Sequence, residues 1–166
     1  MLEIAICDNK KEDVLNYKNN LIDAIIKDNL DAEILKVTAN PDELLRAVEG
    51  NGRLLFILLE FLYAQGTSGA ELAKRIRKKD RESYIVFASK HTELIHTAFE
   101  GLIRPAGFLN KPVKRKELIS VFLTAYCDHI NLLKAEGYFS VTIGARFYRI
   151  PTRNILYFEA AQKKYF

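Results

Sequence analysis

Cysteine and histidine are scarce in this sequence, which limits the kinds of site that it can build. Two cysteines and three histidines are present among 166 residues. Cys7 and Cys127 stand far apart, with no CxxC pair and no histidine at metal-binding spacing. Neither a disulfide framework nor a zinc site is expected from this pattern. We predict that both thiols are reduced and lie in the core.

Long apolar runs and the common enzyme motifs are also missing. No run approaches the ~20 apolar residues that a membrane helix requires, and Asp8 follows the first apolar stretch too soon for a secretory signal. We therefore expect a cytoplasmic protein without membrane contacts. GxSxG, P-loop and GxGxxG motifs are absent. Hydrolase, NTPase and dinucleotide-binding activities thus have no support, and we expect that the protein is not an enzyme.

Positive charge is concentrated at one end of the chain. The net charge is +4, and residues 138–166 hold five basic side chains against one acidic side chain, so residues 1–137 are neutral overall. Any attraction to a polyanion such as DNA is therefore expected in this tail. Its aromatic residues could stack on bases, but we interpret them as the core of a β-rich module: Tyr138, Phe147, Tyr148 and Tyr157.

Predicted strands and helices alternate along the first part of the chain. The strands cover residues 2–7, 32–38, 54–61, 84–88 and 107–110, and the helices begin near residues 11, 41, 68, 92 and 114. Alternation of this kind predicts a parallel sheet with helices on both faces, and a flavodoxin-like strand order suits this length. From residue 138 the period changes to that of a hairpin, over 139–143 and 146–150, and a third strand over 155–159.

Two of the predicted helices have clear inward and outward faces. The helix over residues 11–30 is expected to bury one apolar face made of Val14, Leu15, Leu21, Ile22, Ile25 and Ile26. The helix that begins at Ser68 is expected to turn Leu72, Ala73 and Ile76 inward. Its basic residues are interpreted as a solvated face: Lys74, Arg75, Arg77, Lys78 and Lys79.

The strand over residues 54–61 is apolar except for Glu60 near its end. Because an ionised glutamate is costly to bury, we place Glu60 at the carboxyl edge of the sheet. Polar side chains follow the other strands as well: Asp8 and Asn9, Ser89, and Lys111. In a parallel sheet these residues share one edge, where ligands bind. Carboxylate, amide, hydroxyl and ammonium groups suit Mg²⁺ beside a phosphoryl group.

These motifs, in this order, resemble the receiver domain of bacterial two-component response regulators over residues 1–127. The resemblance implies an α/β, flavodoxin-like (CheY-like) doubly wound five-stranded parallel sheet. It also implies a metal site of Asp8, Asn9, Glu60 and the backbone carbonyl of Leu62, with Glu60 in the place of the phosphoacceptor aspartate. Ser89 matches the hydroxyl that contacts the phosphoryl group in this family. Lys111-Pro112 matches the lysine after the fifth strand and the proline that follows it, whose peptide bond is often cis. Phe108 falls on the aromatic switch position.

Two departures from the family pattern predict weak phosphorylation. Glutamate is one methylene longer than aspartate, roughly 1.5 Å, and a positioning error of that size costs about 100-fold in rate. Asn9 removes one charge from the cation site. Two interpretations of Glu60 remain open. Its carboxylate could partly mimic a phosphoryl group by pairing with Lys111 and Ser89, or it could be an ion-paired remnant without switching consequence.

The carboxyl-terminal tail resembles the opening strands of a LytTR DNA-binding domain. The segments that carry this resemblance are Phe147–Pro151, Asn154–Glu159 and Lys163–Tyr165. The implied organisation is a receiver domain over 1–127, a helical linker over 128–137 and a truncated, amino-terminal LytTR fragment over 138–166. Receivers joined to this domain form a family of accessory-gene and virulence regulators, often downstream of peptide-sensing histidine kinases. DNA contacts would require a complete LytTR domain.

We therefore expect a response regulator that controls transcription, with a sensor histidine kinase as partner. The resemblance extends to regulators of peptide quorum sensing. The resemblance implies a homodimer through the helix near residue 92, the strand over 107–110 and the helix near residue 114. The alternative is a phosphorylation-independent pseudo-receiver that binds a partner protein. A flavodoxin-like enzyme would need cofactor contacts that the loops do not supply.

Overall fold

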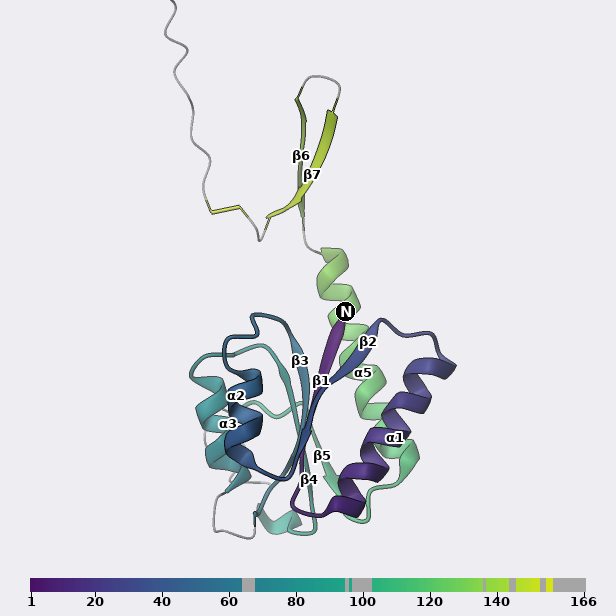
Figure 1. The fold of residues 1–166 in the computed structure, drawn as a ribbon, viewed down its shortest axis with the longest axis vertical. Helices are drawn as coiled ribbons and strands as arrows, with labels where there is room; N and C mark the ends of the chain where they lie inside the picture. Colours follow the sequence, from purple (N-terminus) through teal and green to yellow (C-terminus); the bar gives the residue numbers. More distant parts are fainter. Residues whose placement is uncertain are drawn as a thin grey trace, which may run out of the picture. The chain divides into compact units, whose positions relative to one another are not determined.

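Five parallel strands form the sheet on which the first part of the chain is built (Figure 1). The computed structural model describes residues 1–63, 68–94, 96, 103–135, 137–143, 146–152 and 155–156. The chain divides into two units, Met1–Cys127 and Asp128–Phe166. The strands are β1 (Leu2–Cys7), β2 (Ala32–Thr38), β3 (Leu55–Glu60), β4 (Tyr84–Ser89) and β5 (Gly107–Asn110). Their order, β2-β1-β3-β4-β5, confirms the predicted doubly wound fold.

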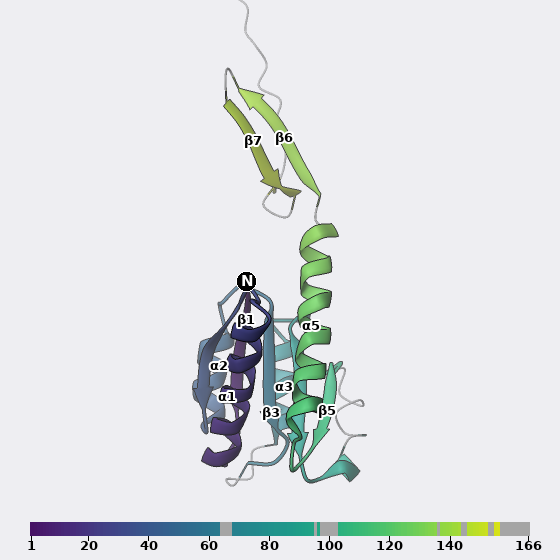
Figure 2. The ribbon, with the colours of Figure 1, turned by 90° about the vertical axis from the view of Figure 1, so that its right-hand side faces the viewer.

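Helices cover both faces of this sheet. The helices are α1 (Lys11–Lys27), α2 (Pro41–Val48), α3 (Gly69–Arg77) and α5 (Arg115–Ala135), with a 3₁₀ turn, η1, at Thr92–Leu94. In Figures 1 and 2, α1 and α5 lie on one face and α2 and α3 on the other. Every residue of β1 and β3 is buried between the two layers. The continuous apolar run of β3 therefore has the structure that its sequence predicts.

Local sequence signals fix where two of the helices begin. The Asn40 side chain accepts hydrogen bonds from the backbone nitrogens of Asp42 and Glu43, at 2.9 and 3.4 Å. Ser68 accepts one from the nitrogen of Ala70 at 3.1 Å. These side chains satisfy amide groups that have no partner within the first helical turn. Both helix starts were predicted from the sequence.

The buried face of α1 differs in part from the predicted one. Tyr17, Leu21 and Ala24 are buried, whereas Leu15 and Ile26 are exposed, so the prediction was wrong for those two residues. The predicted face contained adjacent apolar pairs. Neighbouring residues point about 100° apart around a helix, and both members of such a pair cannot face the sheet equally.

The two thiols also differ in their surroundings. Cys7, the last residue of β1, is buried as predicted, but Cys127 on α5 is exposed, so the prediction of a second core thiol was wrong. The buried residues of α5 follow helical spacing at Leu118, Phe122 and Ala125. Cys127 lies off that stripe and therefore faces outward.

The second unit contains an antiparallel hairpin of β6 (Tyr138–Ile143) and β7 (Arg146–Pro151). Its register pairs Phe139 with Ile150 and Val141 with Tyr148, which confirms the predicted hairpin. Of the predicted strand over 155–159, only the first two residues are described, and they are not in a strand. Likewise, most of the predicted helix over 92–102 lies outside the described residues. No helix in the described part of the chain is long and apolar enough to cross a membrane.

Candidate functional site

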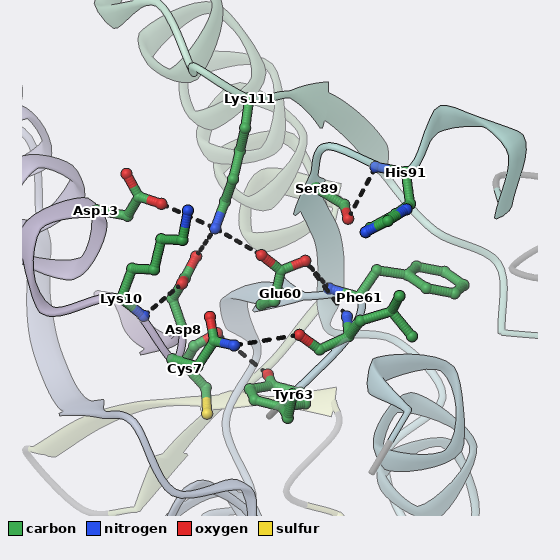
Figure 3. Close-up of polar contacts among 12 residues, drawn as sticks. Cys7, Asp8, Lys10, Asp13, Glu60, Phe61, Tyr63, Ser89, His91 and Lys111 are labelled. Atoms are coloured by element: carbon green, nitrogen blue, oxygen red, sulfur yellow. Dashed lines mark hydrogen bonds and ion pairs between the residues drawn. The ribbon is translucent and has the colours of Figure 1, made fainter. Parts of the chain in front are cut away.

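The carboxyl edge of the sheet collects the polar residues that follow its strands (Figure 3). Asp8 comes directly after β1, Glu60 ends β3, Ser89 ends β4, and Lys111 comes directly after β5. Strand register places Glu60 opposite Ala88, and Ser89 opposite Asn110. Because the strands are parallel, all of these residues lie at one edge, as the sequence predicts.

An ionic cluster lies at the centre of this edge. The Lys111 ammonium is 2.5 Å from Asp8 Oδ2, 2.6 Å from Glu60 Oε2 and 2.9 Å from Asp13 Oδ2. Its side chain is only 2% exposed. Lys111 reaches from the end of β5 to carboxylates that come from three other elements or loops (Figure 3). The structure therefore brings together Asp8, Glu60 and Lys111, and adds Asp13.

Glu60 uses both carboxylate oxygens within the protein. Oε2 accepts from Lys111, and Oε1 accepts from the backbone nitrogens of Phe61 and Leu62 at 2.6 and 3.3 Å. The residue is 7% exposed. The carboxylate is thus turned back onto the chain that follows it. A phosphoryl donor that approaches from solvent meets no free oxygen of Glu60 in this arrangement.

Burial and charge pairing act in opposite directions on the cluster. Burial alone lowers the pKa of Lys111, but its interactions with the carboxylates of Asp8, Glu60 and Asp13 outweigh it and raise that pKa above its ordinary value. Burial raises the pKa of the Asp8 carboxyl, and Lys111 opposes this effect. With the ammonium held protonated at 2.5 Å, the charged form of the Asp8–Lys111 pair is the one that the geometry stabilises at neutral pH.

Ser89 and Phe108 lie near the cluster but make other contacts. The Ser89 hydroxyl accepts a hydrogen bond from the backbone nitrogen of His91 at 3.2 Å. Among the described contacts it has none with Glu60 or with the Lys111 ammonium. Phe108 is half-buried, and its ring centroid lies 6.3 Å from that of Phe61 and 6.4 Å from that of Phe87. It therefore packs with aromatic core residues in this state.

The predicted metal ligands contact one another and Lys111. The Asn9 amide nitrogen donates to the carbonyl oxygen of Leu62 at 3.4 Å, so these two groups contact each other. The Lys111 ammonium lies between the carboxylates of Asp8 and Glu60. In the part of the chain that is described, no group of three or more acidic, histidine or cysteine residues is arranged to hold a metal ion. The carboxylates of Asp8 and Glu60 are thus already paired with a cation, and Mg²⁺, which requires closely packed oxygen ligands, would compete with Lys111 for them.

The segment after Glu60 is held tightly against the site. The Tyr63 hydroxyl donates to the carbonyl oxygen of Cys7 at 3.1 Å, and Leu62 forms a β-bridge with Ser68. The nitrogen of Gly69 donates to the carbonyl oxygen of Phe61 at 2.7 Å. Burial raises the pKa of the adjacent Cys7 thiol to about 11, so it stays protonated at neutral pH. This closure was not predicted from the sequence.

Asp13 is the residue of the cluster that the sequence reasoning missed. A signal for it was present, because Asp13 precedes the buried Tyr17, Leu21 and Ala24 at spacings of four, eight and eleven residues. These spacings place it on the inward face of α1. Its position in the first helical turn points it toward the loop that carries Asp8.

Comparison with solved structures identifies the fold. A response regulator receiver domain protein from Clostridium thermocellum superposes with a TM-score of 0.65 at 20% sequence identity, covering 80% of this chain and 99% of that one. The signal receiver domain of a modulated diguanylate cyclase from Desulfovibrio desulfuricans G20 gives 0.62 at 19%, covering 80% and 97%. The first unit has the receiver-domain fold.

Sequence comparison matches more of the chain than the comparison of structures does. The chain is 23% identical over 169 residues to accessory gene regulator protein A of Staphylococcus aureus strain N315. The alignment covers 99% of this chain and 71% of that protein, and so includes the hairpin as well as the receiver unit. No protein-family model matches the chain.

Proposed function

We propose that this chain is a two-component response regulator whose receiver unit carries Glu60 in the phosphoacceptor position. The observation that carries this proposal is the buried contact of Lys111 with both Asp8 and Glu60. These residues come from the ends of β1, β3 and β5, and the receiver fold places its reacting groups at that edge. The similarity to accessory gene regulator protein A supports the same assignment.

The proposed output is control of transcription. The aligned relative is named as a gene regulator, and the net positive charge of this chain resides in residues 138–166. A basic β-rich module favours contact with the DNA backbone. DNA binding would require a complete LytTR domain. A sensor histidine kinase would be the signalling partner, and the receiver would dimerise through the face that includes β5 and α5.

The test is phosphoryl transfer from acetyl phosphate in the presence of Mg²⁺. The native chain should take up little or no label, because both oxygens of Glu60 are engaged. Glu60→Asp shortens the side chain by roughly 1.5 Å, which weakens one of the three ion pairs of Lys111 and restores the length that the receiver site requires. This variant should become labelled. Glu60→Gln is the control that keeps the side-chain length but removes the carboxylate.

Labelling of Glu60→Gln to the level of Glu60→Asp would show that transfer occurs elsewhere in the chain. Failure of a folded Glu60→Asp variant to take up label, with far-UV circular dichroism equal to that of the native chain, would contradict the assignment of this edge as a phosphoacceptor site.

One observation favours a second candidate function, a pseudo-receiver that binds its partner without phosphorylation. Glu60 is buried, hydrogen-bonded at both oxygens and paired with Lys111, which is a complete ionic arrangement without a phosphoryl group. The pseudo-receiver predicts no Mg²⁺-dependent uptake of label from acetyl phosphate, even by Glu60→Asp. The two interpretations of Glu60, a partial phosphoryl mimic or an inert ion pair, differ in what Glu60→Gln does to self-association, measured by analytical ultracentrifugation. A change would show that the carboxylate biases the state of the domain. An unchanged state would favour the inert ion pair.

A further inference from the structure

The ammonium of Lys111 is enclosed by three carboxylates. An ammonium group carries three N–H donors and no acceptor. Lys111 donates to Asp8 and to Glu60 at 2.5 and 2.6 Å and is ion-paired with Asp13 at 2.9 Å, and its side chain is 2% exposed. Figure 3 shows these carboxylates around the tip of Lys111. The cation is therefore fully coordinated by side chains of the protein itself.

Asp13 supplies the third carboxylate from a position outside the loop that follows β1. It lies in the first turn of α1, on the face that buries Tyr17 and Leu21. Asn9 is neutral where the predicted metal site would have an acid, and it contacts the Leu62 carbonyl oxygen. Asp13 thus restores the missing negative charge, but aims it at the ammonium of Lys111.

We propose that Lys111 is the resident cation of this site and that Asp13 is the positioning residue that holds it there, so that the folded site excludes Mg²⁺. Mg²⁺ needs oxygen ligands at about 2.0–2.1 Å in near-octahedral geometry. It would have to use the oxygens of Asp8 and Glu60 that already bind Lys111, and it would be repelled by the neighbouring ammonium. The receiver unit then keeps Lys111 paired with these carboxylates and signals without bound metal. The statement about signalling rests on the proposed function, whereas the ion contacts do not.

Metal exclusion is tested with Mg²⁺ alone, by the melting temperature of the full chain. Titration with Mg²⁺ up to about 10 mM should leave the melting temperature of the native chain unchanged. Lys111→Met frees the three carboxylates, and the same titration should then raise its melting temperature by about 3 °C or more. Lys111→Arg keeps the positive charge and should remain insensitive to Mg²⁺. A native chain that is stabilised by Mg²⁺ would overturn the proposal, whether or not the Lys111→Met variant folds.

The role of Asp13 is tested by the ammonium itself. A buried, ion-paired ammonium exchanges its protons slowly, and the native chain should show a ¹⁵N–¹H signal for the Lys111 side chain. Asp13→Asn should remove or strongly broaden this signal and should make the melting temperature respond to Mg²⁺. The adjacent Glu12 is exposed, so Glu12→Gln is the matched control and should leave both measurements as in the native chain. Equal behaviour of the two variants would refute a positioning role for Asp13.

These measurements separate the inference from the proposed function. Mg²⁺ exclusion with no labelling of Glu60→Asp would leave Lys111 as the resident cation of a domain that does not accept a phosphoryl group. Labelling of Glu60→Asp together with Mg²⁺ stabilisation of the native chain would support the response regulator and overturn the resident cation.

Discussion

Two buried glutamates lie at opposite edges of the sheet, and their partners differ in burial. Glu3, near the amino end of β1, is 2.7 Å from Arg53 and accepts from the Asn51 amide at 2.6 Å. The Arg53 side chain is 58% exposed. Glu60, at the carboxyl end of β3, pairs with Lys111, which is 2% exposed.

This difference distinguishes a structural ion pair from a candidate functional one. Arg53 reaches Glu3 from the solvent side, so water can replace it at modest cost. Lys111 is enclosed and shared by Asp8, Asp13 and Glu60, and water cannot readily take its place. The charges at the carboxyl edge are therefore coupled, and a change in one alters the surroundings of the others.

Removal of each cation in turn should give the largest contrast. Lys111→Met leaves buried carboxylates without a counter-charge and should lower the free energy of unfolding by about 4 kcal/mol in metal-free buffer. Arg53→Met leaves Glu3 hydrogen-bonded to Asn51 and lets water reach the carboxylate where Arg53 was. This variant should lower the free energy of unfolding by about 1 kcal/mol. Urea denaturation of both variants measures the difference. Equal losses would show that the two edges do not differ in the way that burial indicates.

Glycines at the two edges should differ for a steric reason. A Cβ on Gly69 would lie 2.1 Å from the carbonyl oxygen of Glu60, which is backbone and cannot move aside. Gly69→Ala should therefore lower the unfolding free energy by about 3 kcal/mol. Gly52, near Arg53, has φ +68° and nothing within 4 Å. Gly52→Ala should cost only the left-handed backbone strain of about 1–2 kcal/mol.

Thermal denaturation by circular dichroism would rank these two glycine variants. A Gly52→Ala variant less stable than Gly69→Ala would contradict the tight closure of the segment after Glu60.

A half-buried glutamate at the surface provides the smallest expected effect. Glu43 lies 2.9 Å from Lys36 and accepts from the Thr38 hydroxyl at 2.9 Å. Hydrogen bonds from Lys36 and Thr38 lower its pKa. A lowered folded-state pKa contributes stability above the unfolded value, near 4.3, that is lost as the pH falls through the folded-state value. Glu43→Gln should slightly flatten the loss of stability between about pH 5 and pH 3.

Urea midpoints across this pH range, compared with those of Asp42→Asn, would measure the effect of Glu43. Asp42 lies beside Glu43 in the first turn of α2, is exposed and is 3.3 Å from Arg75, so this comparison sets one surface ion pair against another. An unchanged pH profile for Glu43→Gln would show that the surface pair does not survive in solution.

Most of the fold could be predicted because its signals are local. The apolar residues of β1 and β3, the caps at Asn40 and Ser68, and the hairpin each depend on a few neighbouring residues. The shared edge of Asp8, Glu60 and Lys111 follows once the strands are parallel.

Long-range contacts account for the residues that were misassigned. Arg77 was predicted to lie on a solvated face of α3, but its guanidinium donates to the carbonyl oxygens of Ile103 and Ser83 at 2.6 and 2.7 Å. A basic helical stripe gives the same sequence signal whether one of its members is solvated or binds distant carbonyl groups. That prediction was wrong for Arg77.

The sequence by itself determined the alternating elements, the parallel sheet and the edge at which the charged residues collect, because periodicity and capping act over a few residues. Only the tertiary structure decided that Lys111 is paired with three carboxylates, that Asp13 is one of them, and that Glu60 turns back onto the nitrogens of Phe61 and Leu62. Side-chain direction at the end of a strand depends on charges that arrive from other elements, and those charges meet only in the folded chain.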